Sequence, residues 1–328
     1  SEELIKNIYD KALQNKGIFN IDNKIKLILE QIGTVLNISW IIDSIQYTIG
    51  LQGKRMRPLL LLMAHQLFDD NVERALPPAI AIELFHNFTL MHDDIMDSAP
   101  LRRGKVTVHE KWNINAAILS GDAMLIKSYQ SLQYYENKLH ILLFKLLNKT
   151  ALEICEGQQL DINFQTNENV TLEDYIKMIK LKTAVLIACS LKMGAITAGA
   201  SKKNCELIYD FGIKIGLAFQ IKDDFLDVYG DLKSFGKKIG GDILENKKTI
   251  LFHNSYLNIS NQNRALLMEY FSNSYIGNKD KKINDVKRIY TNSGAKSSTK
   301  LLIKEYLDQA KEKINAISID KQKKNILI

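Results

Sequence analysis

The chain has 328 residues, and 46% of them are hydrophobic, which is enough to build one large core. Its formal charge of +7 comes from lysine and arginine spread among acidic neighbours, so we expect an anionic small molecule and no nucleic acid as the partner. No uninterrupted apolar segment reaches the roughly 20 residues that span a bilayer, so we expect no integral membrane segment.

The four prolines all precede residue 101, so no proline interrupts a helix in the rest of the chain. This favours an all-α protein, and we see no boundary that would divide residues 1–328 into more than a single domain. The three cysteines lack both the paired spacing and the nearby histidines of a thiolate metal site. We therefore expect them to be reduced in a cytoplasmic protein.

The first segments are two predicted helices and a basic cluster. Apolar residues recur at three- and four-residue spacing over residues 1–16 and 22–48, which predicts amphipathic helices. Lys54 and Arg57 then lie three residues apart near a predicted helix start, where free N–H groups and the helix dipole also favour anions. The cluster is either a phosphate site or a solvated basic turn.

An acidic motif ends the next predicted helix, which begins at a pair of prolines. If residues 79–97 are helical, Asp93 and Asp97 stand one above the other on one face, with Asp94 beside them. Such carboxylates repel each other unless a cation lies between them, and oxygen ligands suit Mg²⁺. A lone motif of this kind is also typical of a solvated acidic surface.

Two arginines, Arg102 and Arg103, follow this motif after Pro100, which should end the helix and let both side chains turn back towards the carboxylates. Carboxylates, a metal and arginines together describe a phosphate site. His86 lies on the preceding helix, where it is either structural or part of the site.

The middle of the chain adds polar groups at helix faces. Asp161 lies near the end of a long predicted helix and is a further candidate for the metal site. Thr171 and Asp174 predict a helix cap. Lys182 and Thr183 then precede a buried apolar run, where an ammonium and a hydroxyl are unusual unless the lysine extends to solvent.

A second acidic motif repeats the first. Asp223, Asp224 and Asp227 have the same spacing within another apolar helix, shortly after Gln220. Two such motifs cannot both be buried without cations, because an uncompensated buried carboxylate costs several kcal/mol. The pair of motifs therefore indicates several metal ions.

The last third of the chain begins with a stretch rich in glycine and lysine at residues 230–248. Its basic side chains, including Lys237 and Lys247, are of the kind that closes over a phosphate. The asparagine-rich stretch 253–263 and the charged stretch 277–288 are expected to be surface connections, and the segments around Val286–Tyr290 and 295–317 are expected to be helical.

Taken in order, these motifs make the chain similar to the trans-polyprenyl diphosphate synthases, the family of farnesyl and geranylgeranyl diphosphate synthases. The resemblance covers nearly the whole chain. The motifs that carry it are Gly53-Lys54-Arg55-x-Arg57-Pro58, His92-Asp93-Asp94-x-x-Asp97 with Arg102-Arg103-Gly104, Gly121-Asp122, Gly157-Gln158-x-x-Asp161, Lys182-Thr183, Gln220-x-x-Asp223-Asp224-x-x-Asp227 and Gly236-Lys237.

The resemblance implies a homodimer with an all-α fold, in which antiparallel helices surround a central cavity and the two acidic motifs face each other at its mouth. It implies several Mg²⁺ ions per active site, bound by Asp93, Asp94, Asp97, Asp161, Asp223 and Asp227. Isopentenyl diphosphate would be bound by Lys54, Arg57, His86 and Arg103. An allylic diphosphate would be bound by Arg102, Lys182, Thr183, Gln220, Lys237 in preference to Lys238, and Lys247. The residues expected to act in the reaction itself are Asp93, Asp97, Arg102, Lys182, Thr183, Gln220 and Asp223.

The reaction of the family, a head-to-tail (1'-4) condensation, suits these residue types. Breaking an allylic C–O bond leaves a carbocation and a diphosphate, so cations at the leaving group and exclusion of water lower the barrier. Thr183 and Gln220 would stabilise the carbocation through oxygen dipoles, and the released diphosphate would take the final proton.

In the family, product length depends on the residues four and five positions before the first aspartate, here Thr89 and Phe88. An aromatic ring at only one of these positions suggests a short all-trans product, with C20 geranylgeranyl ahead of C15 farnesyl. The alternative is that Phe88 is simply a core residue.

Three other functions remain open. A class I terpene cyclase would share the fold and the first acidic motif, but its second metal motif normally differs. A catalytic or regulatory subunit of a heteromeric longer-chain synthase is the second, although such regulatory subunits usually lose an acidic motif and both are whole here. A basic helical nucleic-acid binder would need a base-reading element, which the sequence does not supply.

Overall fold

The computed structural model describes residues 39–51, 53–167, 169–230, 240–272 and 274–327. They fall into two compact units. Unit 1 consists of residues 149–188 and 210–313. Unit 2 consists of the described residues up to 148, residues 189–209 and residues 314–327. The expectation of a single domain stays a prediction.

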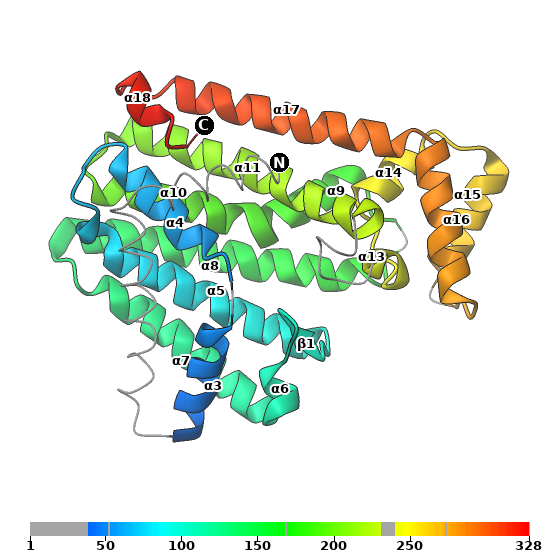
Figure 1. The fold of residues 1–328 in the computed structure, drawn as a ribbon, viewed down its shortest axis with the longest axis horizontal. Helices are drawn as coiled ribbons and strands as arrows, with labels where there is room; N and C mark the ends of the chain where they lie inside the picture. Colours follow the sequence, from blue (N-terminus) through cyan, green and yellow to red (C-terminus); the bar gives the residue numbers. More distant parts are fainter. Residues whose placement is uncertain (1–38, 52, 168, 231–239, 273, 328) are drawn as a thin grey trace. The chain divides into compact units, whose positions relative to one another are not determined.

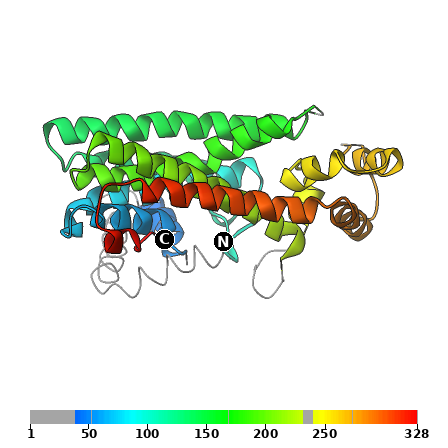
Figure 2. The ribbon, with the colours of Figure 1, turned by 90° about the horizontal axis from the view of Figure 1, so that it is seen from above.

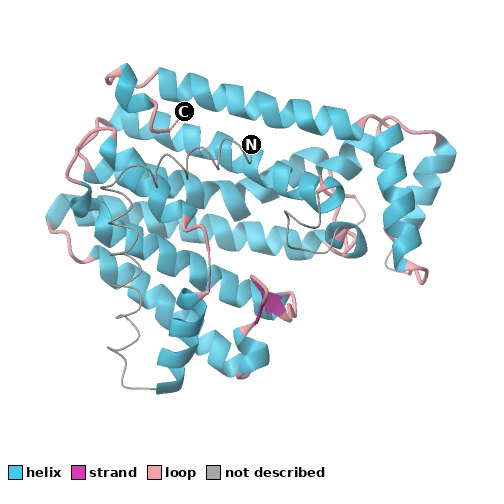
Figure 3. Ribbon diagram, in the orientation of Figure 1, coloured by secondary structure: helices cyan, strands magenta, loops and turns pink. Residues whose placement is uncertain are grey.

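Helices make up most of the described chain, which confirms the all-α expectation, and the only strands within it are one short antiparallel pair (Figure 3). The α-helices are α3 (Ser39–Gly50), α4 (Met56–Gln66), α5 (Leu76–Met96), α6 (Val108–Lys111), α7 (Ile114–Leu132), α8 (Asn137–Phe164), α9 (Leu172–Ile179), α10 (Val185–Thr197), α11 (Lys202–Tyr229), α13 (Gly241–Leu244), α14 (Ile250–Tyr256), α15 (Asn261–Tyr270), α16 (Lys279–Asn292), α17 (Ala295–Asn315) and α18 (Lys321–Lys324). The remaining elements are a 3₁₀ turn η2 (Val72–Ala75), a π-helical turn η3 (Lys180–Ala184), and the paired strands β1 (Leu101–Arg102) and β2 (Lys105–Val106). None of the described helices is long and apolar enough to cross a membrane.

In unit 2, α5 packs against both α4 and α7 (Figure 1). Two prolines lie in the first turn of α5, where a missing N–H costs nothing, and the helix buries Ile80, Leu84 and Phe85. These apolar residues anchor the helix in the core. The predicted helix over residues 79–97 is confirmed, and its buried residues hold the first acidic motif at its C-terminal end.

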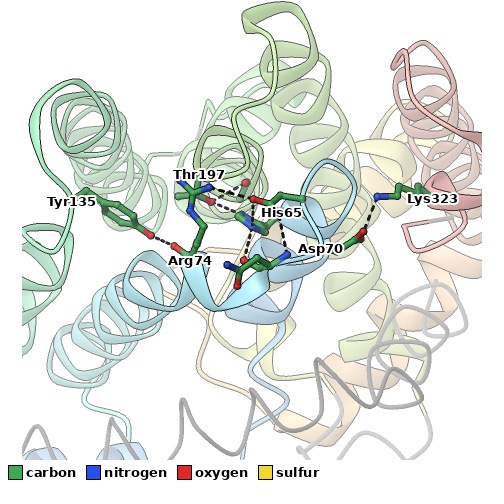
Figure 4. Close-up of polar contacts among 9 residues, drawn as sticks. His65, Asp70, Arg74, Tyr135, Thr197 and Lys323 are labelled. Carbon is green, nitrogen blue, oxygen red and sulfur yellow. Dashed lines mark hydrogen bonds and ion pairs between the residues drawn. The ribbon is translucent and has the colours of Figure 1, made fainter.

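A buried histidine joins several elements of unit 2. His65, near the end of α4, has Nδ1 2.8 Å from Thr197 Oγ1 and Nε2 3.1 Å from the carbonyl oxygen of Asn71 (Figure 4). Burial lowers the pKa of His65, so its ring is neutral, and Nε2 donates to the carbonyl oxygen of Asn71 because a carbonyl oxygen can only accept. Lys323 of α18 forms an ion pair of 3.2 Å with Asp70 in the same region. These contacts tie α10 to α4, and α18 to the segment that follows α4.

Unit 1 contains α9, η3 and α13 to α16, together with parts of α8, α10, α11 and α17. Thr171 caps α9 as predicted, because its Oγ1 accepts from the backbone N–H of Asp174 at 3.1 Å while the Asp174 carboxylate accepts from the backbone N–H of Thr171 at 3.0 Å. α15 and α16 lie side by side (Figures 1 and 2).

Two stretches that we expected to be surface connections are helical instead. Residues 253–263 fall in α14 and the start of α15, and residues 277–288 contain most of α16. α16 buries Lys282, Val286 and Ile289 at helical spacing, so its other charged residues form the outer face of a helix. Of the two helices predicted over residues 1–16 and 22–48, the described part, residues 39–48, is helical and belongs to α3, and the rest lies outside the described residues.

Candidate active site

Unit 1 contains a pocket whose walls come from α8, α9, η3, α11 and the segment 242–249. Four residues expected to contact an allylic diphosphate line it together: Lys182, Thr183, Gln220 and Lys247. Asp161, a predicted metal ligand, lines the same pocket. The fold therefore gathers residues that lie on four separate segments of the sequence.

A π-helical turn sets the positions of Lys182 and Thr183, because η3 winds more widely than the α-helices on either side. Gly157 of α8 packs so closely against this turn that a Cβ there would lie 2.7 Å from the carbonyl carbon of Leu181. Asp161, about one turn further along α8, accepts a hydrogen bond from Lys182 Nζ at 2.5 Å. The pair holds a long cationic side chain in one place in the pocket wall.

Thr183 and Gln220 meet in the wall of the pocket, where Thr183 Oγ1 donates to Gln220 Oε1 at 2.8 Å. Neither side chain is an acid or a base, so the pair places oxygen dipoles in the pocket wall, and its part in a reaction stays a prediction. Asp224 lies one helical turn after Gln220 and is only 6% exposed. Burial raises the pKa of Asp224 to about 6.

The segment after α11 adds two carboxylates and a lysine. Asp242 donates its backbone N–H to Asp227 Oδ2 at 3.0 Å, and Lys247 Nζ lies 2.7 Å from Glu245 Oε2 and 3.8 Å from Asp242 Oδ1. Burial, followed by the charges of Asp224 and Asp227, raises the pKa of Asp242 well above its usual range. Burial opposes the charge of Lys247, but the neighbouring carboxylates outweigh it and raise the pKa of this lysine.

The second acidic motif occupies the last turns of α11. Asp224 is buried, whereas Asp223 and Asp227 are half-buried and closer to solvent. This division leaves Asp223 and Asp227 as the carboxylates of the motif that a metal ion reaches most easily. Lys237, which we expected to contact the allylic diphosphate, lies outside the described residues.

In unit 2 the first acidic motif ends α5 and is followed by the β1–β2 hairpin. Arg102 turns back as predicted, and it donates from Nε at 2.8 Å and from Nη2 at 2.5 Å to Oδ1 of Asp94. Asp94 is 6% exposed, and burial raises its pKa while Arg102 opposes that shift. Asp94 therefore anchors Arg102, whereas Asp93 is half-buried and Asp97 is exposed.

A second group of cations in unit 2 surrounds His86, whose Nε2 accepts a hydrogen bond from Arg57 Nη1 at 3.0 Å. Burial, followed by the charges of Arg57, Arg103 and Arg102, keeps the pKa of His86 well below its usual range, so the ring is neutral. Burial also lowers the pKa of Arg57 to about 10, and the buried Glu83 opposes that shift. An anion bound here would relieve the repulsion among these three arginines.

Arg103 approaches the same group across a glycine. A Cβ on Gly53 would lie 2.7 Å from Arg103 Cζ, so any larger residue would push this guanidinium away. Arg103 also donates from Nη1 to the carbonyl oxygen of Leu51 at 3.4 Å. Arg57 and Arg103 thus lie close enough to His86 to lower its pKa, and Lys54 is exposed next to Gly53.

The residues expected to set product length lie on α5. The ring of Phe88 packs edge-on against Phe85 at 5.5 Å and against His92 at 4.8 Å between centroids. Thr89 Oγ1 donates to the carbonyl oxygen of His86 at 2.8 Å. Both side chains are half-buried, and their part in product length stays a prediction.

Magnesium would have to be held by carboxylate oxygens. Within the part of the chain that the structure describes, no three Asp, Glu, His or Cys side chains converge as a ready-made metal site. Each acidic motif nevertheless offers carboxylates that are not fully buried, Asp93 and Asp97 in one and Asp223 and Asp227 in the other. This donor chemistry fits Mg²⁺, and the exact ligand set stays a prediction.

Comparison with known proteins identifies the family. The family model described as polyprenyl synthetase matches residues 38–292. The chain is 36% identical over 281 residues to a short chain isoprenyl diphosphate synthase of Methanocaldococcus jannaschii, covering 85% of this chain and 81% of that protein. It is 37% identical over 279 residues to a geranylgeranyl diphosphate synthase of Methanosarcina mazei, covering 83% and 82%. A crystal structure of geranylgeranyl pyrophosphate synthase matches with a TM-score of 0.89 and 44% identity, covering 94% of this chain and 95% of that one.

The all-α fold and these relatives identify a trans-prenyltransferase, as the sequence predicts. The chain belongs to the polyprenyl synthetase family.

Three residues escaped sequence reasoning: Tyr175 and Asp242 in unit 1, and Glu83 in unit 2. Tyr175 and Asp242 line the pocket of unit 1, and Glu83 is 4% exposed in α5. A signal existed for Glu83, because it is a lone charge within an otherwise apolar run. Asp242 follows two glycines directly after a basic stretch, a position that also marks a backbone turn near a polar site.

Proposed function

We propose that this chain condenses isopentenyl diphosphate with an allylic diphosphate and releases diphosphate and a longer all-trans prenyl diphosphate. The observation that carries the proposal is the pocket of unit 1, which combines Lys182 and Lys247 with Thr183 and Gln220. The lysines suit a diphosphate leaving group, and the oxygen dipoles suit a carbocation. The names of the relatives from M. jannaschii and M. mazei support the same reaction class.

Magnesium is the cofactor that the carboxylates would hold. The ligands that we propose are Asp93, Asp97 and Asp223, assisted by Asp94, Asp161 and Asp227. Bound there, Mg²⁺ would neutralise the charge that develops on the leaving diphosphate. Arg102, Lys182, Lys237 and Lys247 would contact the same diphosphate from the protein side.

Isopentenyl diphosphate would bind at the cations around His86. Arg57 is desolvated, so an anion gains more from it than from a fully solvated arginine, and the more exposed Arg103 adds a second guanidinium nearby. Neutral His86 holds Arg57 in place through its Nε2 without adding a charge of its own. Lys54 would add a contact from the exposed side.

In the reaction, the allylic C–O bond breaks and its electron pair leaves with the diphosphate. The double bond of isopentenyl diphosphate then attacks the allylic carbon, and the proton lost from the isopentenyl unit passes to the released diphosphate. Thr183 and Gln220 face the positive charge with oxygen atoms, and the apolar body of the substrate excludes water that would otherwise capture the cation.

The product that we propose is C20 geranylgeranyl diphosphate ahead of C15 farnesyl diphosphate. The aromatic ring of Phe88, braced by Phe85 and His92, lies about one turn before the first acidic motif on α5 and would limit the length of the growing chain. The relative from M. mazei carries the name of a geranylgeranyl diphosphate synthase, which supports this length.

A homodimer is the assembly that we propose, because unit 2 exposes large apolar side chains on α7 and α8. They include Ile118, Leu119 and Ile126 on α7 and Ile141, Leu142 and Phe144 on α8, with exposed fractions of 38–58%. The two helices touch where Tyr129 packs on Phe144 at 5.4 Å. A second copy would remove this surface from water. The three free cysteines of the described chain, one of them exposed, suit a cytoplasmic location.

The test is an assay of the purified chain with isopentenyl diphosphate, Mg²⁺ and, in turn, each allylic diphosphate from C5 to C15. We expect a C20 product on chromatography beside C15, C20 and C25 standards, and no product when a chelator removes Mg²⁺. A chain that turns over only after another subunit is added would contradict the proposal and favour a heteromeric synthase.

A further inference from the structure

Four side chains from three helical segments form one continuous hydrogen-bonded chain beside the pocket of unit 1. Tyr175 of α9 donates its hydroxyl hydrogen to Asp224 Oδ2 at 2.5 Å, and Gln220 Nε2 donates to Asp224 Oδ1 at 2.9 Å. Thr183 Oγ1 in turn donates to Gln220 Oε1 at 2.8 Å. All four residues line the pocket.

Burial fixes the donor-to-acceptor direction of these hydrogen bonds. Asp224 and Tyr175 are 6% and 2% exposed, so the carboxylate has to be satisfied by protein donors, and it takes one from each side. Because the amide NH₂ of Gln220 is committed to Asp224, its carbonyl oxygen must point towards Thr183. The single hydroxyl hydrogen of Thr183 is then committed to Gln220.

The fixed direction of the hydrogen bonds determines whether Thr183 presents its hydroxyl hydrogen or its oxygen lone pairs to the pocket. With its hydrogen turned to Gln220, Oγ1 can offer only lone pairs to any other group. Without the carboxylate at the far end, the amide of Gln220 could flip and the hydroxyl of Thr183 could turn its hydrogen towards the pocket. A hydrogen there would repel a carbocation that an oxygen lone pair attracts.

We propose that Tyr175 and Asp224 are positioning residues that fix the hydrogen-bond direction through Gln220, so that Thr183 presents oxygen to the allylic carbocation. This inference rests on the proposed function. It gives the middle aspartate of the second motif a different task from its neighbours. Asp223 and Asp227 face metal and diphosphate, and Asp224 sets the orientation of the groups that meet the carbocation.

Tyr175→Phe tests the inference, because it keeps the buried ring but removes the hydroxyl that holds Asp224 Oδ2, so the carboxylate can turn away from Gln220 and release its amide. We expect kcat to fall about tenfold or more, since a misdirected dipole acts on the transition state, while KM for both diphosphates stays within about twofold. The matched control is Tyr270→Phe, also in unit 1 but outside the pocket, where a buried tyrosine donates to Asp285 Oδ2 at 2.6 Å. The control should lose similar stability and keep the wild-type kcat.

A second pair of variants guards against poor folding of the first. Asp224→Asn and the double variant with Tyr175→Phe should have kcat values within about twofold of each other, because both changes act through one chain. If the losses of kcat from the two substitutions multiply in the double variant, or if Tyr175→Phe keeps the wild-type kcat, the inference is wrong while the proposed function still stands. A wild-type protein that does not turn over the two diphosphates would overturn the proposed function with it.

Discussion

Replacing Gly157 by alanine should disturb the wall of the pocket where α8 meets η3. A Cβ at this position would lie 2.7 Å from the carbonyl carbon of Leu181 and closer still to the amide nitrogen of Lys182. Non-bonded carbon atoms stay about 3.5–4.0 Å apart, so the two segments must separate by about 1 Å. Overpacking of this kind costs about 1–3 kcal/mol, and alanine returns up to about 1 kcal/mol of helix propensity. We expect the free energy of unfolding to fall by about 1–2 kcal/mol.

The loss of activity should be larger than the loss of stability, because Lys182 and Thr183 lie on the turn that moves. A misplacement of about 1 Å can cost about 100-fold in rate, so we expect kcat of Gly157→Ala to fall between about 10- and 100-fold. Steady-state kinetics with varied allylic diphosphate and a denaturant titration measure the two effects on one preparation.

Gly50→Ala is the matched control for this experiment. Gly50 also lies in a helix, at the end of α3, but no atom lies within 4 Å of a Cβ placed there. The control should keep the wild-type kcat and a free energy of unfolding within about 1 kcal/mol of the wild type. The reasoning is wrong if Gly157→Ala matches this control in both kcat and unfolding.

Three further predictions concern other parts of the chain. Phe88→Ala should shift the extracted product to prenyl chains longer than C20 on chromatography, and an unchanged product would assign Phe88 to the core alone. His65 has its pKa lowered from 6.5 in the folded state, so the wild type should lose stability as pH falls below about 6.5. His65→Gln should flatten that dependence in thermal melts between pH 5 and 8, and parallel curves would count against the assignment. Lys282→Met removes a buried ammonium that donates to Asn246 Oδ1 at 2.5 Å. Because Asn246 directly precedes Lys247, which we propose as a contact of the allylic diphosphate, the variant should raise KM for that substrate. The free energy of unfolding should change by less than about 1 kcal/mol. A large loss of stability with unchanged KM would refute that expectation.

Features with local causes could be predicted from the sequence. The cap of α9 depends on Thr171 and Asp174, which lie three residues apart. The return of Arg102 to Asp94 depends on the end of α5 at Met96, after which Ser98 has a φ of 48° and Pro100 prevents the helix from resuming. Each aspartate motif fixes its own geometry through helical spacing alone.

Features with distant causes could not be predicted. The π-helical turn at Lys180–Ala184 leaves the apolar pattern almost unchanged, and it is accommodated only because Gly157 of another helix packs against it. The bond between Tyr175 and Asp224 joins residues 49 positions apart. α16 was misjudged because burial of Lys282 among the rings of Phe271 and Tyr275 is invisible in a charged sequence.

The two proposed diphosphate sites hold their cations in different ways. Lys182 is paired with Asp161 and Arg102 with Asp94, so carboxylates fix these side chains and cancel much of their charge. Arg57 is instead held by neutral His86, which fixes the guanidinium and leaves its charge intact.

This difference predicts how each substrate depends on magnesium. Near His86, the buried Glu83 supplies one negative charge against both Arg57 and Arg103, so a diphosphate there meets net positive charge from the protein alone. The allylic diphosphate meets lysines and arginines already balanced by carboxylates, and it needs added positive charge from the metal. Calorimetric titrations with and without a chelator should therefore show that removing Mg²⁺ weakens binding of a non-reactive allylic analogue by at least about tenfold more than binding of isopentenyl diphosphate. Equal losses for the two ligands would mean that the cations around His86 do not form a metal-independent site.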